Sequence, residues 1–263
     1  MTIAIGALWP WARLASLAGL RENPPPRATI LIADSRWTFL YPGGRPSDYS
    51  DVGTKLFRIA KDAGAVYAGD VDSGEECLAR LARRFEKRRV KLPVTRMARD
   101  LFRAVYSRHH PGHPLGIFLG ACSDRGDPEL WYFDDSSDFE PVPLVGLNLL
   151  AFPETEKTFR AGLEYEKHII RSGQPAEPID GALWLIAALK EHVIDKDVDP
   201  SVGGKIQCAV IDGGGFQPIG ISGSADTGTT WQPISPRAGE LKTFRPRKIR
   251  GPRAQVGLHK VMD

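Results

Sequence analysis

The chain has 263 residues, of which 42% are hydrophobic and 25% are charged, and its formal net charge is +3. This length and composition allow a large buried core in one or two domains, and we expect one compact domain with an appended tail. The chain has no signal-peptide pattern at its start and no apolar run of roughly 18 residues, which excludes a membrane-spanning protein and predicts a cytoplasmic one.

The positive charge is concentrated near the C-terminus. Residues 235–263 carry eight Lys or Arg against only Glu240 and Asp263. Because this stretch has several Pro and Gly and little apolar periodicity, we expect 220–263 to be a basic, flexible tail. No aromatic platform or recognition helix accompanies the charge, so nucleic-acid binding is the less favoured reading.

The first half of the chain alternates strands with one helix pair. Strand patterns cover 2–9 and 28–39, with a long connection over about 10–27, and after a loop at 41–53 the ranges 55–60 and 65–70 form a hairpin. Helices follow at 72–89, capped by Asp72 or Ser73, and at 94–110. Their apolar stripes lie beside arginine-rich faces, a combination that suits subunit contacts.

The second half repeats this alternation. Strand patterns at 115–123, 129–135 and 141–148 precede helices at 153–170 and 178–194, and a last hairpin covers 205–212 and 216–221. Runs of strands that alternate with helix pairs predict two stacked antiparallel sheets with helices outside. The predicted fold class is therefore α+β, in the form of a four-layer αββα sandwich.

Five short strings make the pattern more specific. "TIAIG", "ADSRWT", "KLFRI", "YAGDVDSGEECLARL" and "DPSVGGKI" occur in this order. Together with the element order, they resemble the proteasome β-subunit family, including the bacterial HslV-like and Anbu-like peptidases. The resemblance covers about 2–219 and implies an N-terminal-nucleophile (Ntn) hydrolase whose identical subunits assemble into a ring or stack.

The resemblance also implies a catalytic set. Thr2 would be the nucleophile once Met1 is removed, Lys55 would place a positive charge beside it, and Asp34 would pair with Lys55. The N–H of Gly69 would stabilise the oxyanion, and Asp199, with Asp197 as a near alternative, would lie by the α-amine. An α-amine titrates near 7.7–8.0, so that of Thr2 could act as the base. Taken singly, each of these residues favours a structural role, whereas together, at matching spacings in a matching element order, they favour an inherited site.

The same resemblance predicts the substrate pocket. Its lining residues would be Trp37, Phe57, Tyr67 and Val71, and three rings around one depression predict small apolar side chains before the scissile bond. The expected substrate is a peptide or protein, and the sequence does not indicate whether an unfoldase assists.

Two positions depart from the family pattern. Leu147 stands where a serine would help to hold the α-amine, and Val202 replaces a second supporting serine. Loss of supporting hydroxyls can lower activity sharply without removing the nucleophile. Two functions therefore stay open: a threonine peptidase, and a proteasome-like scaffold or binding subunit that has lost turnover.

No cofactor or metal site is predicted. His109, His110 and His113 lie in a Pro- and Gly-containing loop without an adjacent carboxylate or cysteine, so a metal is the less favoured reading. The three cysteines, Cys77, Cys122 and Cys208, are widely spaced and without a CxxC motif. We expect ordinary buried thiols.

Overall fold

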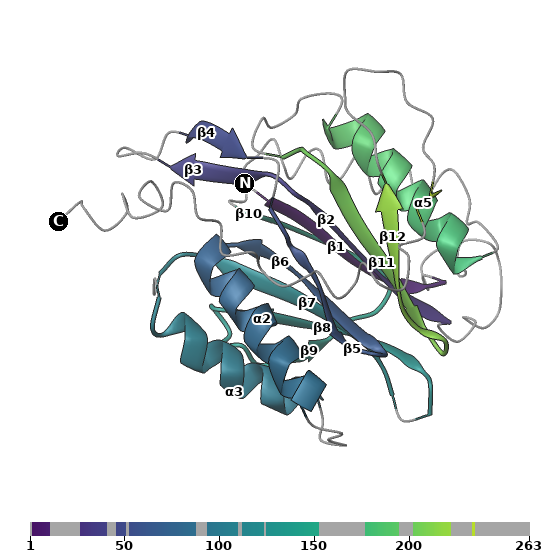
Figure 1. The fold of residues 1–263 in the computed structure, drawn as a ribbon, viewed down its shortest axis with the longest axis horizontal. Coiled ribbons are helices and arrows are strands. Elements are labelled where there is room, and N and C mark those ends of the chain that lie inside the picture. The colour runs from purple at the N-terminus through teal and green to yellow at the C-terminus, as the bar shows by residue number, and fades with distance from the viewer. Residues whose placement is uncertain are drawn as a thin grey trace.

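The fold consists of two antiparallel sheets with helices on their outer faces (Figure 1). The structure, a computed structural model, describes residues 2–10, 27–40, 46–50, 53–87, 94–109, 112–123, 125–152, 177–194, 202–221 and 233–234. The predicted helix at 153–170, most of the connection at 10–27 and most of the basic tail lie outside these residues.

The first sheet has six strands in the order β10-β1-β2-β11-β12-β13. Their bounds are β1 Thr2–Trp9, β2 Ala28–Asp34, β10 Leu147–Phe152, β11 Ile206–Asp212, β12 Gly215–Ile221 and β13 Pro233–Ile234. Because β13 pairs with β12, this sheet extends beyond the predicted boundary at 219. The strand at the N-terminus, β1, lies inside the sheet between β10 and β2.

The second sheet has five strands in the order β5-β6-β7-β8-β9. Their bounds are β5 Leu56–Ala60, β6 Ala63–Gly69, β7 Leu115–Cys122, β8 Pro128–Asp134 and β9 Val142–Pro143. A separate two-stranded ribbon pairs β3 Trp37–Leu40 with β4 Pro46–Ser50, where the sequence predicted the end of the 28–39 strand and then a loop at 41–53.

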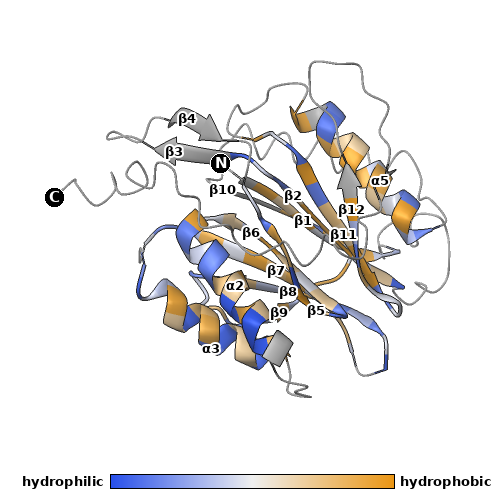
Figure 2. Ribbon diagram, in the orientation of Figure 1, coloured by the Kyte–Doolittle hydropathy of each residue, from blue (hydrophilic) through white to orange (hydrophobic). Residues whose placement is uncertain are grey.

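Three apolar layers hold these parts together (Figure 2). Alternate residues of β1 face two of these layers. Ile3 and Ile5 face helix α5 (Pro178–Leu189), whereas Ala4 and Leu8 face the second sheet. On the far side, α2 (Val71–Lys87) and α3 (Val94–Tyr106) cover the second sheet. A π-helical turn, η1 (Lys190–Ile194), continues α5.

The apolar stripes of α2 and α3 are buried within this chain. Leu78 and Leu81 of α2, with Phe102 and Val105 of α3, are buried against the second sheet. Arginines form much of the outward surface of these helices. The stripes therefore give no support to the predicted subunit contacts, and ring assembly stays a prediction.

Two predicted boundaries change for local reasons. Helix α2 starts at Val71, one residue earlier than predicted, and its cap is Asp70, whose Oδ2 accepts a hydrogen bond from Ser73 N at 2.9 Å. The predicted strand at 141–148 is divided between β9 and β10, which belong to different sheets, and Gly146 turns the chain between them with φ of 71°. Among the described residues, no helix is both long and apolar enough to cross a membrane.

Candidate functional site

The centre of the site is the carboxylate of Asp34, which is fully buried at the end of β2. Its Oδ2 accepts a hydrogen bond from the N–H of Arg36, two residues further on, at 3.2 Å. This local turn is typical of Asp and ends the strand, so the chain leaves the six-stranded sheet and enters β3. The sequence predicted one continuous strand over 28–39, and this turn is the reason for the break.

Lys55 lies beside this carboxylate. Its Nζ is 2.8 Å from Asp34 Oδ1 and donates a second hydrogen bond to the carbonyl oxygen of Arg36 at 2.5 Å. Both side chains are 0% exposed. Burial of two charged groups carries a large desolvation cost. This cost is offset only when both groups also make their remaining hydrogen bonds. The structure thus brings together two of the predicted catalytic residues, which are 21 positions apart in sequence.

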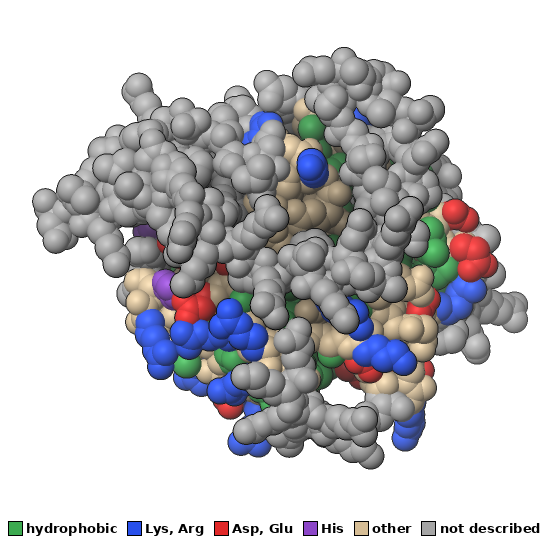
Figure 3. All heavy atoms as spheres, in the orientation of Figure 1, with side chains coloured by type: hydrophobic (Ala, Val, Ile, Leu, Met, Phe, Trp, Pro, Cys, Tyr) green, Lys and Arg blue, Asp and Glu red, His purple; other side chains and the backbone are tan. Residues whose placement is uncertain are grey.

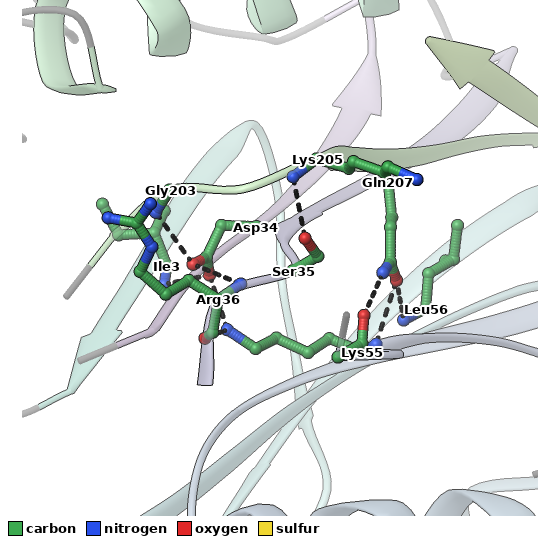
Figure 4. Close-up of polar contacts among 10 residues, drawn as sticks. Ile3, Asp34, Ser35, Arg36, Lys55, Leu56, Gly203, Lys205 and Gln207 are labelled. Atoms are coloured by element: carbon green, nitrogen blue, oxygen red, sulfur yellow. Dashed lines mark hydrogen bonds and ion pairs between the residues drawn. The ribbon is translucent and has the colours of Figure 1, made fainter. Parts of the chain in front are cut away.

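Backbone groups complete the shell of Asp34. Oδ1 also accepts a hydrogen bond from Ile3 N at 3.1 Å, and Oδ2 accepts one from Gly203 N at 3.2 Å. The carboxylate therefore joins β1, the turn after β2 and the segment before β11 (Figure 4). Since Ile3 follows Thr2 directly, this contact fixes the start of β1 next to the Asp34–Lys55 pair.

Sequence reasoning missed the residue that holds the backbone of Lys55. Gln207 Oε1 accepts hydrogen bonds from Lys55 N and Leu56 N at 2.9 and 3.0 Å, and its Nε2 donates to the carbonyl of Gly53 at 2.5 Å. Figure 4 shows this side chain reaching from β11 to the start of β5. No sequence signal marked Gln207, because a single Gln within a strand pattern is normally read as a solvated position.

The glycine at position 203, in the segment before β11, is required for a steric reason. A Cβ at Gly203 would lie 2.7 Å from the guanidinium carbon of Arg36, so a side chain there would displace Arg36. Ser35 Oγ accepts a hydrogen bond from Lys205 N at 2.7 Å and so holds the same segment. Val202, which precedes this glycine, is buried in the core beneath α5.

Gly69 ends β6 with φ of 107°, in the region that favours glycine. A Cβ there would lie 2.0 Å from the carbonyl oxygen of Pro114, which accepts a hydrogen bond from Asp70 N at 2.9 Å. Both observations require glycine at the predicted oxyanion position. They give a structural reason for this residue that is independent of any role in catalysis.

Two of the predicted pocket residues are neighbours. The ring centroids of Phe57 and Tyr67 are 6.5 Å apart. Tyr67 is fully buried beneath α2, where a Cβ at Gly74 would lie 2.3 Å from its ring. Val71 is half-buried and begins α2, while the side chain of Trp37 lies outside the described residues. Truncating the Tyr67 side chain would therefore leave a cavity in the core.

The predicted place of Leu147 is wrong. Leu147 pairs with Ala7 across β1 and β10, whereas Thr2 pairs with Phe152. Five residues of strand separate these pairs, about 16 Å at roughly 3.3 Å per residue. Leu147 therefore does not lie by the α-amine. Asp199 and Asp197 lie outside the described residues, as do the side chain of Thr2 and Met1.

The histidine-containing loop follows α3. His109 Nε2 contacts Glu76 of α2, which also pairs with Arg80, and His113 Nδ1 lies 3.8 Å from Asp70 Oδ1. Burial raises the pKa of Glu76, but the His109 hydrogen bond and the Arg80 charge outweigh it, so that the pKa lies below its ordinary value. His110 is outside the described residues, in which no group of His, Cys, Asp or Glu could hold a metal ion.

All three cysteines are free thiols. Cys77 and Cys208 are buried, and desolvation raises the pKa of each well above its ordinary value. Cys122 is half-buried, its Sγ donates to the carbonyl of Asp212 at 3.1 Å, and burial together with nearby carboxylates raises its pKa to about 11. None of the three has the lowered pKa of a nucleophilic cysteine.

Comparison of the chain with protein-family models and with curated protein sequences gives no match.

Proposed function

We propose that the protein is an N-terminal threonine amidohydrolase, a peptidase that acts within a self-assembled, proteasome-like complex. In this proposal the two sheets and their outer helices form the four-layer αββα sandwich of the Ntn hydrolases. The observation that carries it is that Asp34 Oδ1 binds both Lys55 Nζ and Ile3 N, at 2.8 and 3.1 Å. One buried carboxylate thus fixes an ammonium group and the residue next to Thr2 in a single arrangement.

The proposed chemistry begins after Met1 is removed. Thr2 Oγ attacks the carbonyl carbon of a peptide bond, and its proton passes to the α-amine, directly or through water. Lys55 stabilises negative charge on Oγ in the transition state, and the N–H of Gly69 stabilises the oxyanion that forms. The C–N bond then breaks, and the leaving amine takes the proton from the α-ammonium group. Water finally hydrolyses the ester and releases the free threonine.

The Asp34–Lys55 pair supports this mechanism through preorganisation. A charge that is already held in place costs no reorganisation when negative charge develops on the reacting oxygen, and a buried site strengthens the interaction. The three backbone N–H donors on Asp34 keep the carboxylate, and hence Lys55, in one orientation. In the same proposal Asp199 supports the α-amine, and Phe57, Tyr67, Trp37 and Val71 favour small apolar side chains before the scissile bond.

A second candidate is a proteasome-like scaffold or binding subunit without turnover. Val202 favours it, because this buried apolar side chain stands where the family pattern has a serine hydroxyl. The scaffold requires the same fold and the same assembly, but it does not require a free threonine amine.

Hydrolysis of fluorogenic peptide amides by the purified protein separates the two candidates. The peptidase predicts turnover of substrates with Ala or Val before the reporter group, loss of turnover in Thr2→Ala and partial turnover in Thr2→Ser, since serine keeps the hydroxyl. Turnover that persists in Thr2→Ala would place the chemistry elsewhere. If the wild type has no turnover although Met1 is absent and the chain is folded, the scaffold is the better account.

A further inference from the structure

A groove of about 430 Å³ lies between α2 and α3, on the face of these helices that points away from the sheets. Leu101, Ala104 and Val105 of α3 line it, and Leu101 and Val105 are almost fully buried. Its charged lining residues are Arg80, Arg83, Arg84, Arg108 and Asp100. Figure 3 shows Lys and Arg side chains gathered over this part of the molecule.

The arginines on the opposite flank of α3 are neutralised within the protomer. Arg99 binds Glu140 at 2.9 Å and Asp100 at 3.1 Å, and Arg103 pairs with Asp138. Asp138 and Glu140, the two carboxylates from the 135–140 turn, therefore pair with arginines that do not line the groove. The same two helices thus carry two classes of arginine, one with and one without a carboxylate partner among the residues that the structure describes.

The groove holds the second class. Arg83, Arg84 and Arg108 are exposed and make no ion pair with any residue that the structure describes. Arg80 is paired with Glu76. Like charges gathered in one groove repel one another, and carboxylates from outside the protomer would relieve this repulsion.

The lining favours an acidic peptide over other anions. None of the residues that line the groove is aromatic, so it has no platform on which the bases of a nucleic acid could stack. An extended or helical peptide can instead place carboxylates on the arginines and small apolar side chains against Ala104. The chain's own end does not fit, because 235–263 carries eight basic residues against two acidic ones.

We propose that the α2–α3 groove is the docking surface for an acidic segment of a partner protein. This inference is independent of the threonine chemistry, since the groove residues are separate from the Asp34 network. It assigns to Arg83, Arg84 and Arg108 the binding of carboxylates.

The test measures binding of a fluorescein-labelled twelve-residue peptide of alternating Glu and Ala by fluorescence anisotropy, at 50 and 300 mM NaCl. The groove variant is Arg83→Gln/Arg84→Gln/Arg108→Gln, which keeps long side chains with good helix propensity. The matched control, Arg58→Gln/Arg103→Gln/Arg125→Gln, removes the same charge from exposed sites outside the groove. Circular dichroism confirms that both variants are folded.

We expect the groove variant to bind the peptide at least about tenfold more weakly than wild type, and the control variant to stay within about twofold, with weaker wild-type binding at 300 mM NaCl. Equal losses in both variants would overturn the proposal in favour of net charge. No loss in either variant would overturn it in favour of another surface, such as the basic tail. A twelve-nucleotide single-stranded DNA that binds more tightly than the peptide, with the same dependence on the groove, would show a nucleic-acid surface instead.

Discussion

At the scale of single residues, the site depends on one carboxylate that has several tasks. Asp34 ends β2, holds the start of β1 through Ile3 N, holds the glycine segment through Gly203 N and neutralises Lys55. Each contact satisfies a buried polar group, so the same residue is required both for the fold and for the proposed chemistry. This double role changes what a mutation at the site will do.

Substituting Lys55 by Met should destabilise the protein by about 3–5 kcal/mol, because the fully buried Asp34 carboxylate would lose its ammonium partner. The complete burial of the pair means that its loss would affect the fold as well as the proposed chemistry. Urea denaturation measures the effect. Lys61→Met, at an exposed turn position, is the control and should change stability by less than about 0.5 kcal/mol. Equal stability of the Lys55 variant and wild type would contradict this account.

Gln207→Leu tests the clamp on the backbone at Lys55. The change leaves two N–H groups without their acceptor and should cost roughly 2–6 kcal/mol, at 1–3 kcal/mol for each unsatisfied group. Hydrogen exchange at Lys55 and Leu56 should become faster than elsewhere in β5. Gln217→Leu, whose side chain contacts Asp212 at the other end of β11, should leave exchange at these two amides unchanged. Uniformly faster exchange across the chain would show a general loss of stability instead.

The reactivity of the Cys122 thiol at different pH values provides a further test. Because the pKa of Cys122 is raised to about 11, only about one molecule in a thousand carries its thiolate at pH 8. In the unfolded chain the pKa returns to about 8.5, so iodoacetamide should modify native Cys122 on the order of a hundredfold more slowly than in urea. The native rate should rise with pH up to about 11. Mass spectrometry counts the modified thiols, and rapid modification of the native protein at pH 8 would be incompatible with this pKa.

At the scale of elements, the strand and helix pattern was predictable where periodicity is strong, as in β1, α3 and the β11–β12 hairpin. The predicted strand boundaries were wrong where a single residue ends or redirects a strand. The Asp34 turn divides one predicted strand into β2 and β3, and Gly146 divides another between two sheets. Periodicity does not encode such breaks, because the residues on both sides keep their strand pattern.

The start of α2 is a testable case. Sequence reasoning assigned its cap to Asp72 or Ser73, whereas Asp70 Oδ2 accepts the hydrogen bond from Ser73 N. Asp70→Ala should therefore lower stability by about 1 kcal/mol. Asp72→Ala loses only a favourable interaction with the helix dipole and should cost a few tenths of a kcal/mol. Thermal denaturation compares the two variants, and a larger loss for Asp72 would restore the original assignment.

At the scale of the whole molecule, the sequence predicted two antiparallel sheets and the meeting of Asp34 with Lys55, although β1, β2 and the start of β5 come from separate parts of the chain. The resemblance of five short sequence strings to a known family implied the Asp34–Lys55 pair. The supporting residues Gln207 and Ser35 could not be predicted in this way, because their roles depend on how three segments meet. The place of Leu147 was wrong for the same reason: only strand pairing shows which residue of β10 lies opposite Thr2.

The burial of the apolar stripes of α2 and α3 limits how identical subunits could assemble. Since most apolar residues of α2 and α3 that the structure describes pack on the second sheet, contacts between subunits through these helices would be largely polar. The predicted ring or stack of identical subunits therefore has to find its apolar contacts on other surfaces.

The central claim is that Thr2 is a free, reactive N-terminal nucleophile beside Lys55. The most direct measurement is the mass of the N-terminal peptide after treatment of the native protein with a β-lactone, which acylates a reactive Thr Oγ. We predict that Met1 is absent, that one β-lactone adduct lies on Thr2, and that unfolding the protein before treatment prevents the adduct. Retention of Met1, or an unmodified Thr2 in the folded protein, would contradict it.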